Sequence, residues 1–140
     1  MTNIAPPNVS ELRSAAERLR SVVIHTRLIP LHSYRVRSHI LLKPEVLQAV
    51  GSFKIRGVFN AVASLQEVER QRGLSTVNAG NTAQALCWAG RFFDVPARSV
   101  MPDTAPAGKI DAVRRYGSTP VLLPIDEVFR FLREKRWEAE

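Results

Sequence analysis

The second half of the chain alternates short apolar segments with amphipathic ones, and no other feature constrains the fold as strongly. The apolar segments predict strands at 74–77, 97–101 and 121–123. Helical spacing of apolar residues predicts helices at 82–93, 106–116 and 126–137. Strands and helices that alternate through short links are typical of a parallel sheet with helices packed on it. We therefore expect an α/β fold, an open parallel sheet with helices on both faces.

The first third of the chain has a weaker pattern. Asn8 and Glu11 form a capping-box pattern that predicts the start of a helix over 8–23. Its apolar face would hold Leu12, Ala16, Leu19 and Val23. The loop that follows is expected to contain a short strand near Leu31, and the apolar run at 40–43 predicts a second one.

Length and composition indicate one globular unit with a real core. The chain has 140 residues, of which 45% are hydrophobic and 24% charged. It contains no apolar run of the ~20 residues that span a bilayer, and residues 1–8 lack the pattern of a secretory signal. We expect a cytoplasmic protein that has no membrane partner.

The net charge of +7 raises the question of nucleic-acid binding. The arginines are spread from Arg13 to Arg136, and acidic residues interrupt them throughout. A dispersed surplus of positive charge is more typical of a solvated surface than of a stripe that follows phosphates. We therefore expect no nucleic-acid partner.

Cysteine and histidine give no sign of a metal site or a disulfide. The single Cys87 lies in a helical apolar pattern, so we expect a small buried side chain. His25, His32 and His39 recur every seven residues, but loop signals between them exclude a common helical face. No metal is expected.

The segment Gly51-Ser52-Phe53-Lys54-Ile55-Arg56-Gly57 places one lysine in an unusual setting, in a chain that has far fewer lysines than arginines. Glycines let the backbone approach a ligand, and an aromatic neighbour can desolvate an ammonium and favour the neutral amine. A neutral lysine amine can form a Schiff base with a carbonyl. The alternative is an ordinary loop lysine at the start of a helix, since apolar residues follow at helical spacing: Ile55, Val58, Phe59, Val62 and Leu65.

A second group of polar residues, 78–84, lies where a predicted strand gives way to a predicted helix. Ligands of open parallel sheets bind beyond the carboxyl ends of the strands, and the free N–H groups of a helix start attract anions such as carboxylates. Gly80 permits a sharp turn, while Asn78, Asn81 and Thr82 offer neutral donors. The alternative is a plain turn that an asparagine caps.

These residues together resemble the threonine/serine dehydratases, which belong to the fold-type-II pyridoxal phosphate enzymes and are related to serine racemase. The resemblance begins at about Thr26 and continues, in order, to the last residue. Its motifs are Lys43-Pro44-Glu45, Gln48, the segment 51–57, Gly80-Asn81 with 83–85, Met101-Pro102, Ala105-Pro106, Lys109 and Tyr116-Gly117. The resemblance implies the small domain of such an enzyme, of the tryptophan synthase β type.

The resemblance also implies roles for individual residues. Lys54 would hold pyridoxal 5'-phosphate as an internal aldimine, Phe53 would pack beside the ring, and Asn81 would bind the phenolic oxygen of the cofactor. The carboxylate of a small amino acid substrate would lie against the loop of Asn78, Ala79, Gly80, Asn81 and Thr82. The implied reaction is elimination from a hydroxy amino acid, threonine or serine, followed by release of ammonia and a 2-oxo acid.

The chain departs from the family at positions that face the substrate. Serine is usual where this chain has Asn78, and histidine where it has Thr82, so substrate choice is open. Racemases of this family have a serine at the position of Ala79, and alanine cannot exchange a proton. This favours elimination, while a serine racemase or a β-replacement enzyme of the same fold stays an alternative.

Length adds a further alternative. Members of the family are much longer, and their glycine-rich loop for the cofactor phosphate lies beyond the segment that matches this chain. On the resemblance, residues 1–50 belong to the large domain, 51–140 form the small α/β domain, and the remainder of the large domain is absent. The expected full-length protein is a homo-oligomer. The chain could equally be a truncated, non-catalytic remnant.

Overall fold

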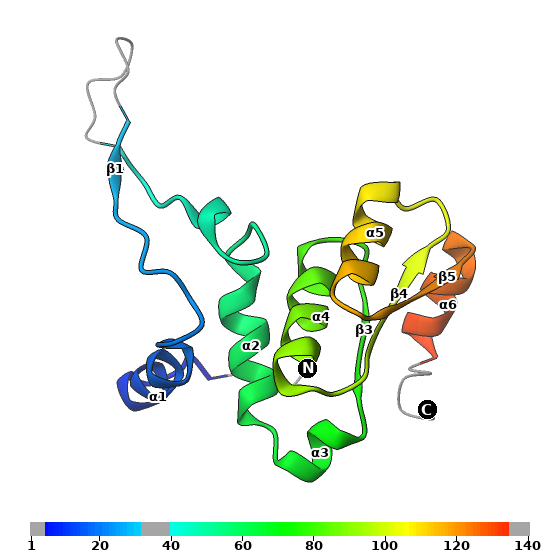
Figure 1. Ribbon diagram of the computed structural model, residues 1–140, viewed down its shortest axis with the longest axis horizontal. Coiled ribbons are helices and arrows are strands. Elements are labelled where there is room, and N and C mark those ends of the chain that lie inside the picture. Colours follow the sequence, from blue (N-terminus) through cyan, green and yellow to red (C-terminus); the bar gives the residue numbers. More distant parts are fainter. Residues whose placement is uncertain (1–4, 32–39, 135–140) are drawn as a thin grey trace.

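The computed structural model describes residues 5–31 and 40–134, and the three expected strands form one parallel sheet in it. The sheet comprises β3 (Leu74–Val77), β4 (Ala97–Pro102) and β5 (Thr119–Leu123). Its strand order is β3-β4-β5, and both neighbouring pairs run parallel (Figure 1). The strand predicted at 74–77 is confirmed without change, while the other two extend slightly further than expected.

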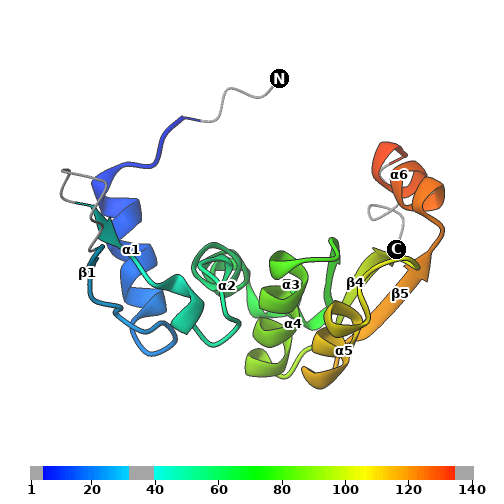
Figure 2. The same ribbon diagram turned by 90° about the horizontal axis from the view of Figure 1, so that it is seen from above.

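Helices cover both faces of this sheet, as predicted. Met101 of β4 packs on one face against α4 (Asn81–Phe93) and α5 (Ala107–Arg115). The preceding residue, Val100, packs on the other face against α6 (Ile125–Arg133). Successive side chains of a strand point to opposite faces, so one strand holds both layers together. Figure 2 shows α4 and α6 on opposite sides of the sheet.

A further helix, α2 (Lys54–Ser64), packs on α4 and adds an outer layer. Phe59 lies at the centre of this contact, with ring centroids of Trp88, Phe92 and Phe93 at 5.9, 5.0 and 5.2 Å. Gly90 of α4 allows close approach to the sheet, because a Cβ there would lie 2.6 Å from the Cβ of Ala97. The aromatic residues therefore join two helices, although Phe92 stays 52% exposed.

The first helix, α1 (Val9–Leu19), is shorter than the predicted 8–23. Its predicted start is correct, since the Asn8 side chain accepts from the Glu11 N–H at 2.9 Å and the Glu11 carboxylate accepts from the Asn8 N–H at 2.7 Å. The helix ends before the β-branched residues 22–24, which are poor helix formers. The predicted apolar face is wrong in part, because only Leu19 is buried.

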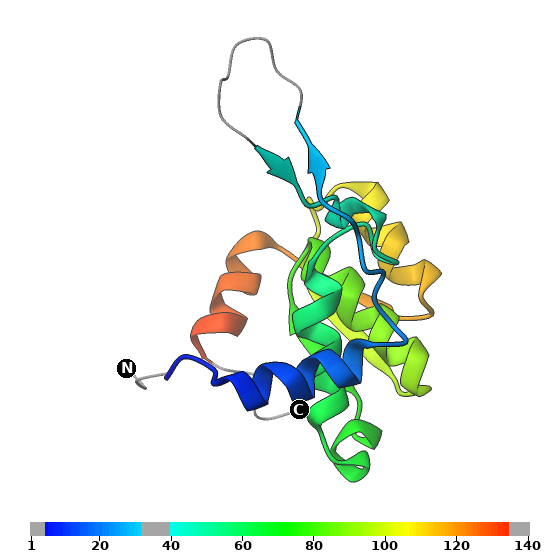
Figure 3. The ribbon, with the colours of Figure 1, turned by 90° about the vertical axis from the view of Figure 1, so that its left-hand side faces the viewer.

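Two short strands, β1 (Ile29–Pro30) and β2 (Leu41–Leu42), form an antiparallel ribbon. Figure 3 shows this ribbon extending away from the helices. All of its described side chains are exposed. The ribbon confirms the two short strands expected in this region; residues 32–39 lie outside the described ranges.

Two short elements and one helix face were not anticipated. A 3₁₀ helix, η1 (Glu45–Leu47), and a short helix, α3 (Glu67–Gln71), are too brief to show a period in the sequence. On α6 the buried residues are Val128 and Phe131, whereas Phe129 and Leu132, expected on the apolar side, are largely exposed. Residues 135–140 lie outside the described part of the chain, so the predicted extension of this helix to 137 is not described. Within the described ranges, no helix has the length and apolar character of a membrane span.

Candidate active site

Lys54 is the first residue of α2 and directly follows a tight turn. Gly51 adopts a φ of 67°, a left-handed conformation that glycine tolerates best. Its N–H donates to the Gln48 carbonyl at 2.7 Å, which closes the turn just before the helix. The ammonium of Lys54 lies 5.0 Å from the ring centroid of Phe53, on the face of the aromatic ring.

The apolar enclosure expected around Lys54 is not present among the described residues. Phe53 is 57% exposed, and the Lys54 side chain is exposed as well. The two side chains project together from the start of α2, and the ring shields only one side of the amine. The sequence correctly placed an aromatic residue beside this lysine, but an adjacent ring does not exclude water by itself.

Lys54 opens onto a pocket of about 400 Å³ between α2 and the start of α4. The lining is mostly apolar and consists of Phe53, Lys54, Arg56, Gly57, Val58, Ala61 and Thr82. The fold therefore brings the predicted lysine and one residue of the predicted asparagine loop into the same pocket. Of that loop, Thr82 is the residue that lines this pocket in the described structure; residues 78–81 lie outside its lining.

The loop before α4 is held by its own hydrogen bonds. The Asn78 Oδ1 accepts from the N–H of Gly80 at 2.7 Å and from the N–H of Ala83 at 3.4 Å. The Asn78 N–H donates to the Val100 carbonyl at 3.1 Å, and the fully buried Ser99 hydroxyl donates to the Asn78 carbonyl at 2.6 Å. Asn78 thus serves as the turn cap that the sequence allowed as the plainer alternative, whereas the contact made by Ser99 was not predicted.

A contact that sequence reasoning missed joins α5 to the start of α4. The Lys109 ammonium donates to the Asn81 Oδ1 at 3.3 Å. Lys109 lies in the first turn of α5, where the helix dipole disfavours a positive charge. Lys109 belongs to the motifs of the resemblance, but they did not predict its contact with Asn81.

An ion pair fixes the segment that carries Lys54 to the rest of the chain. The Arg56 guanidinium donates through Nε and an Nη to the Glu45 carboxylate, at 2.8 and 2.9 Å. Thr26 adds a hydroxyl at 3.1 Å. The hydrogen bonds from Arg56, against the effect of desolvation, lower the pKa of Glu45 from 4.5 to about 2. Gln48 binds the N–H and the carbonyl of Ile24, at 3.0 and 2.8 Å. The residues around 24–26 are thereby tied to the lysine turn.

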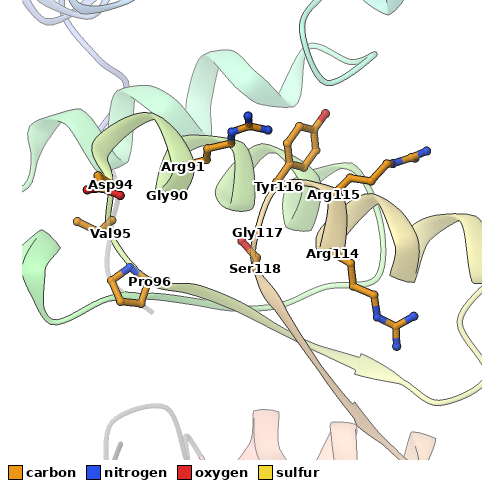
Figure 4. Close-up of a pocket in the computed structure, with 10 residues that line it drawn as sticks. All are labelled: Gly90, Arg91, Asp94, Val95, Pro96, Arg114, Arg115, Tyr116, Gly117 and Ser118. Carbon is orange, nitrogen blue, oxygen red and sulfur yellow. The ribbon is translucent and has the colours of Figure 1, made fainter.

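A larger pocket, of about 630 Å³, lies at the opposite end of the sheet (Figure 4). It is built from the last turns of α4 and α5 and the residues that follow them. Arg91, Arg114 and Arg115 line it, but Figure 4 shows the last two directed away from each other. Positive charges in a last helical turn complement the helix dipole. None of the residues predicted for the site lines it, whereas Phe53, Lys54 and Thr82 line the smaller pocket.

The histidines and the cysteine form no metal site among the described residues. Among the described residues, no group of three or more histidine, cysteine or acidic side chains could hold a metal. His25 is exposed, while His32 and His39 lie outside the described ranges. Cys87 is buried as predicted, and desolvation raises the pKa of its thiol.

Comparison with known proteins identifies the family of this chain. The model of the family described as pyridoxal-phosphate dependent enzyme matches residues 19–139. The chain therefore belongs to the pyridoxal-phosphate dependent enzyme family.

Individual relatives narrow the resemblance. The chain is 40% identical over 116 residues to the L-threonine ammonia-lyase of Thermotoga maritima, covering 81% of this chain and 29% of the relative. It is 39% identical over 109 residues to an L-threo-3-hydroxyaspartate ammonia-lyase of a Pseudomonas species, covering 76% and 34%. The structure of maize serine racemase superposes with a TM-score of 0.85 at 28% identity, covering 96% of this chain and 42% of that one. The chain thus spans about a third of the length of the curated relatives it matches.

The residues around Lys54 fit a bound cofactor. A Cβ on Gly57 would meet no atom within 4 Å, so this glycine of α2 leaves open space in the pocket that it shares with Lys54. The Ser52 hydroxyl is buried and has no hydrogen-bond partner among the described residues, which is unusual for a buried polar atom. The exposed amine of Lys54, the open space at Gly57 and the buried hydroxyl of Ser52 therefore lie within six residues of the chain, about one and a half helical turns.

Proposed function

We propose that this chain forms the lysine-bearing part of a pyridoxal phosphate-dependent lyase that deaminates a hydroxy amino acid, threonine or serine. The observation that carries the proposal is the pocket that Lys54 shares with Thr82 at the start of α4. Two relatives whose names describe ammonia-lyases support the reaction type. Because the chain spans about a third of these relatives, activity and substrate are proposed for the whole protein.

The proposed mechanism gives each residue a task. Lys54 would hold the cofactor through its Nζ, and Phe53 would lie against one side of the ring. Pyridoxal phosphate, when bound, supplies a conjugated ring that accommodates the charge left when the α-proton of the substrate departs. The Lys54 amine would receive this proton as a general base. Asn81 would donate from its amide to the phenolic oxygen of the cofactor.

The start of α4 is the proposed place for the substrate carboxylate. The first N–H groups of a helix have no partner within it and attract anions. We assign the carboxylate to the loop 78–82, with the N–H groups of Asn81 and Thr82 as donors. The Asn78 Oδ1 accepts from the Gly80 N–H, and its amide nitrogen is the end that can donate to a carboxylate.

Racemisation is the second candidate, because the maize serine racemase structure is so similar. Racemisation requires a proton donor on the face of the substrate opposite Lys54. Ala79 carries no exchangeable proton in its side chain, which supports elimination. We also propose that residues 1–50 belong to a larger domain, that 51–140 form the small domain, and that the protein acts in the cytoplasm as a homo-oligomer.

The decisive experiment maps the attachment site and the product together. The complete gene product is incubated with pyridoxal phosphate, reduced with borohydride and digested, and the adduct is located by mass spectrometry. We expect the adduct on Lys54, and its loss in Lys54→Arg but not in Lys43→Arg. With L-threonine or L-serine, ammonia and a 2-oxo acid should form faster than D-serine.

Two results would contradict the proposal. An adduct on Lys43 or Lys109, or on no lysine, would remove Lys54 from its role. D-serine that accumulates faster than ammonia would favour the racemase.

A further inference from the structure

We infer that Lys109 is a positioning residue for Asn81: its ammonium fixes which end of the Asn81 amide faces the cofactor site. The functional importance of that orientation rests on the proposed function. The contact itself is a hydrogen bond of 3.3 Å from Lys109 to Asn81, and it joins the starts of two helices that are distant in the sequence.

The chemistry of the two groups determines the orientation. An ammonium has three donors and no acceptor, so it can bind the Asn81 amide only through the carbonyl oxygen. The amide nitrogen, with its two protons, is then turned away from Lys109 and is free to donate elsewhere. Asn81 is exposed, so without this contact the amide could rotate and present its oxygen instead. An oxygen in that position would repel the anionic oxygen that Asn81 is proposed to bind.

The position of Lys109 is unfavourable for the helix that bears it. A cation in the first turn of a helix meets the positive end of the dipole. The first turns of α4 and α5 contain no acidic residue to compensate. The starts of both helices and the lysine therefore place positive potential at the Asn81 amide, which suits a site for an anionic oxygen.

A purely structural role for Lys109 is poorly supported. The contact between α4 and α5 is already made by buried apolar side chains, including Ala83, Cys87 and Val113. A half-buried lysine whose hydrogen bond is exposed adds little to such a core. Replacing it should leave the fold unchanged.

The test compares Lys109→Met with Arg115→Met, which removes one positive charge from the far, exposed end of the same helix. In isotope-labelled chain without cofactor, the Asn81 side-chain amide resonances should move in Lys109→Met and stay in place in Arg115→Met.

With pyridoxal phosphate added to the complete gene product, Lys109→Met should still form the Lys54 adduct. It should bind the cofactor roughly tenfold more weakly, the effect of losing about one charge-assisted hydrogen bond. The cofactor absorption band should also shift.

Lys109→Arg is the conservative variant, and it should restore most of the affinity and the original absorption band, because a guanidinium is also a pure donor. The inference is overturned if the Asn81 resonances and the absorption band are unchanged in Lys109→Met, or if Arg115→Met produces the same changes. Absence of a Lys54 adduct in the unmodified protein would instead contradict the proposed function. The amide resonances would still report on the orientation of Asn81 in that case.

Discussion

The availability of the Lys54 amine depends on a few residues around it. The turn at Gly51 brings the backbone sharply into α2, so Lys54 leaves the helix at its first residue. At that position the side chain is not covered by a preceding helical turn. The ring of Phe53 then lies beside the amine and supplies an aromatic surface on one side. The same residues that make the lysine accessible also leave it without enclosure in the described structure.

Glu45 and Arg56 hold this turn in place, and their pairing should make stability depend on pH. The pKa of Glu45 is lowered from 4.5 to about 2 in the folded chain, chiefly by hydrogen bonds from Arg56. A carboxylate with a lowered pKa stabilises the fold above its unfolded pKa, and the stabilisation is lost as pH falls through the folded pKa. The pair should therefore contribute fully above about pH 4.5 and progressively less down to about pH 2.

Replacing the carboxylate tests this dependence. Glu45→Gln should lower the free energy of unfolding by about 1–2 kcal/mol at neutral pH. This is less than the full pKa shift would give, because part of the Arg56 side chain faces water, which screens the ion pair. Urea unfolding of both proteins between pH 7 and pH 2 should show the difference shrinking only below about pH 4.5. Glu17→Gln is the control, because its ion pair with Arg20 is well exposed and should contribute little. A difference that does not change with pH would rule out the ion pair as its cause.

Among the elements, α2 both packs on the core and lines the candidate pocket. One side buries Ile55, Phe59 and Val62 against the core, while another forms the wall of the pocket. Gly57 lies on the pocket side, where a Cβ would meet no atom. A glycine within a helix destabilises it by about 0.5–1 kcal/mol relative to alanine. Packing in the described structure therefore does not require a glycine at this position.

Gly57→Ala should therefore separate stability from binding. We expect the free energy of unfolding to rise by about 0.5–1 kcal/mol, while attachment of pyridoxal phosphate to Lys54 becomes weaker because the methyl group enters the pocket. Gly108→Ala in α5 is the matched control, since a Cβ there also meets no atom and Gly108 does not line the pocket. It should not weaken attachment. Equal attachment in Gly57→Ala and the unmodified protein would show that the space is not used.

At the scale of the whole molecule, burial is distributed unevenly along the chain. Nearly all buried apolar side chains lie between Val50 and Phe131, with Leu19 as the exception. The first part of the described chain exposes many large apolar side chains: Val9, Leu12, Ile24, Leu28, Ile29, Leu31, Ile40, Leu41, Leu42, Val46 and Leu47. An apolar surface of this kind favours association.

The chain of 140 residues, studied alone, should therefore protect its amides unevenly and associate. Hydrogen exchange should be slowest in β4, which lies at the centre of the sheet, and fast in α1 and in the β1–β2 ribbon. Light scattering should show association that rises with concentration. Leu42→Lys should reduce it without changing the protection of β4. Uniform protection from α1 to α6 in a monomer would contradict this prediction.

The sequence alone determined the longer elements of the second half of the chain and the residue types of the candidate site. Strong local patterns predicted β3–β5, the capping box of α1 and the helix that begins at Lys54, because backbone preferences and the period of apolar residues act over a few positions. Such patterns cannot orient a helix about its axis. For this reason α6 buries Phe131 where Leu132 was expected, whereas α3 was not predicted because it is too short to show a period.

Only the tertiary structure decided which of these residues meet. The pocket shared by Lys54 and Thr82, and the hydrogen bond from Lys109 to Asn81, each join helices whose separation depends on strand order and on packing across the sheet. The exposure of Lys54 was decided in the same way, because desolvation requires atoms on every side of an amine and a neighbouring residue in sequence supplies only one. The sequence determines which side chains are present in the candidate site, whereas the distances between them and their burial depend on how the helices pack on the sheet.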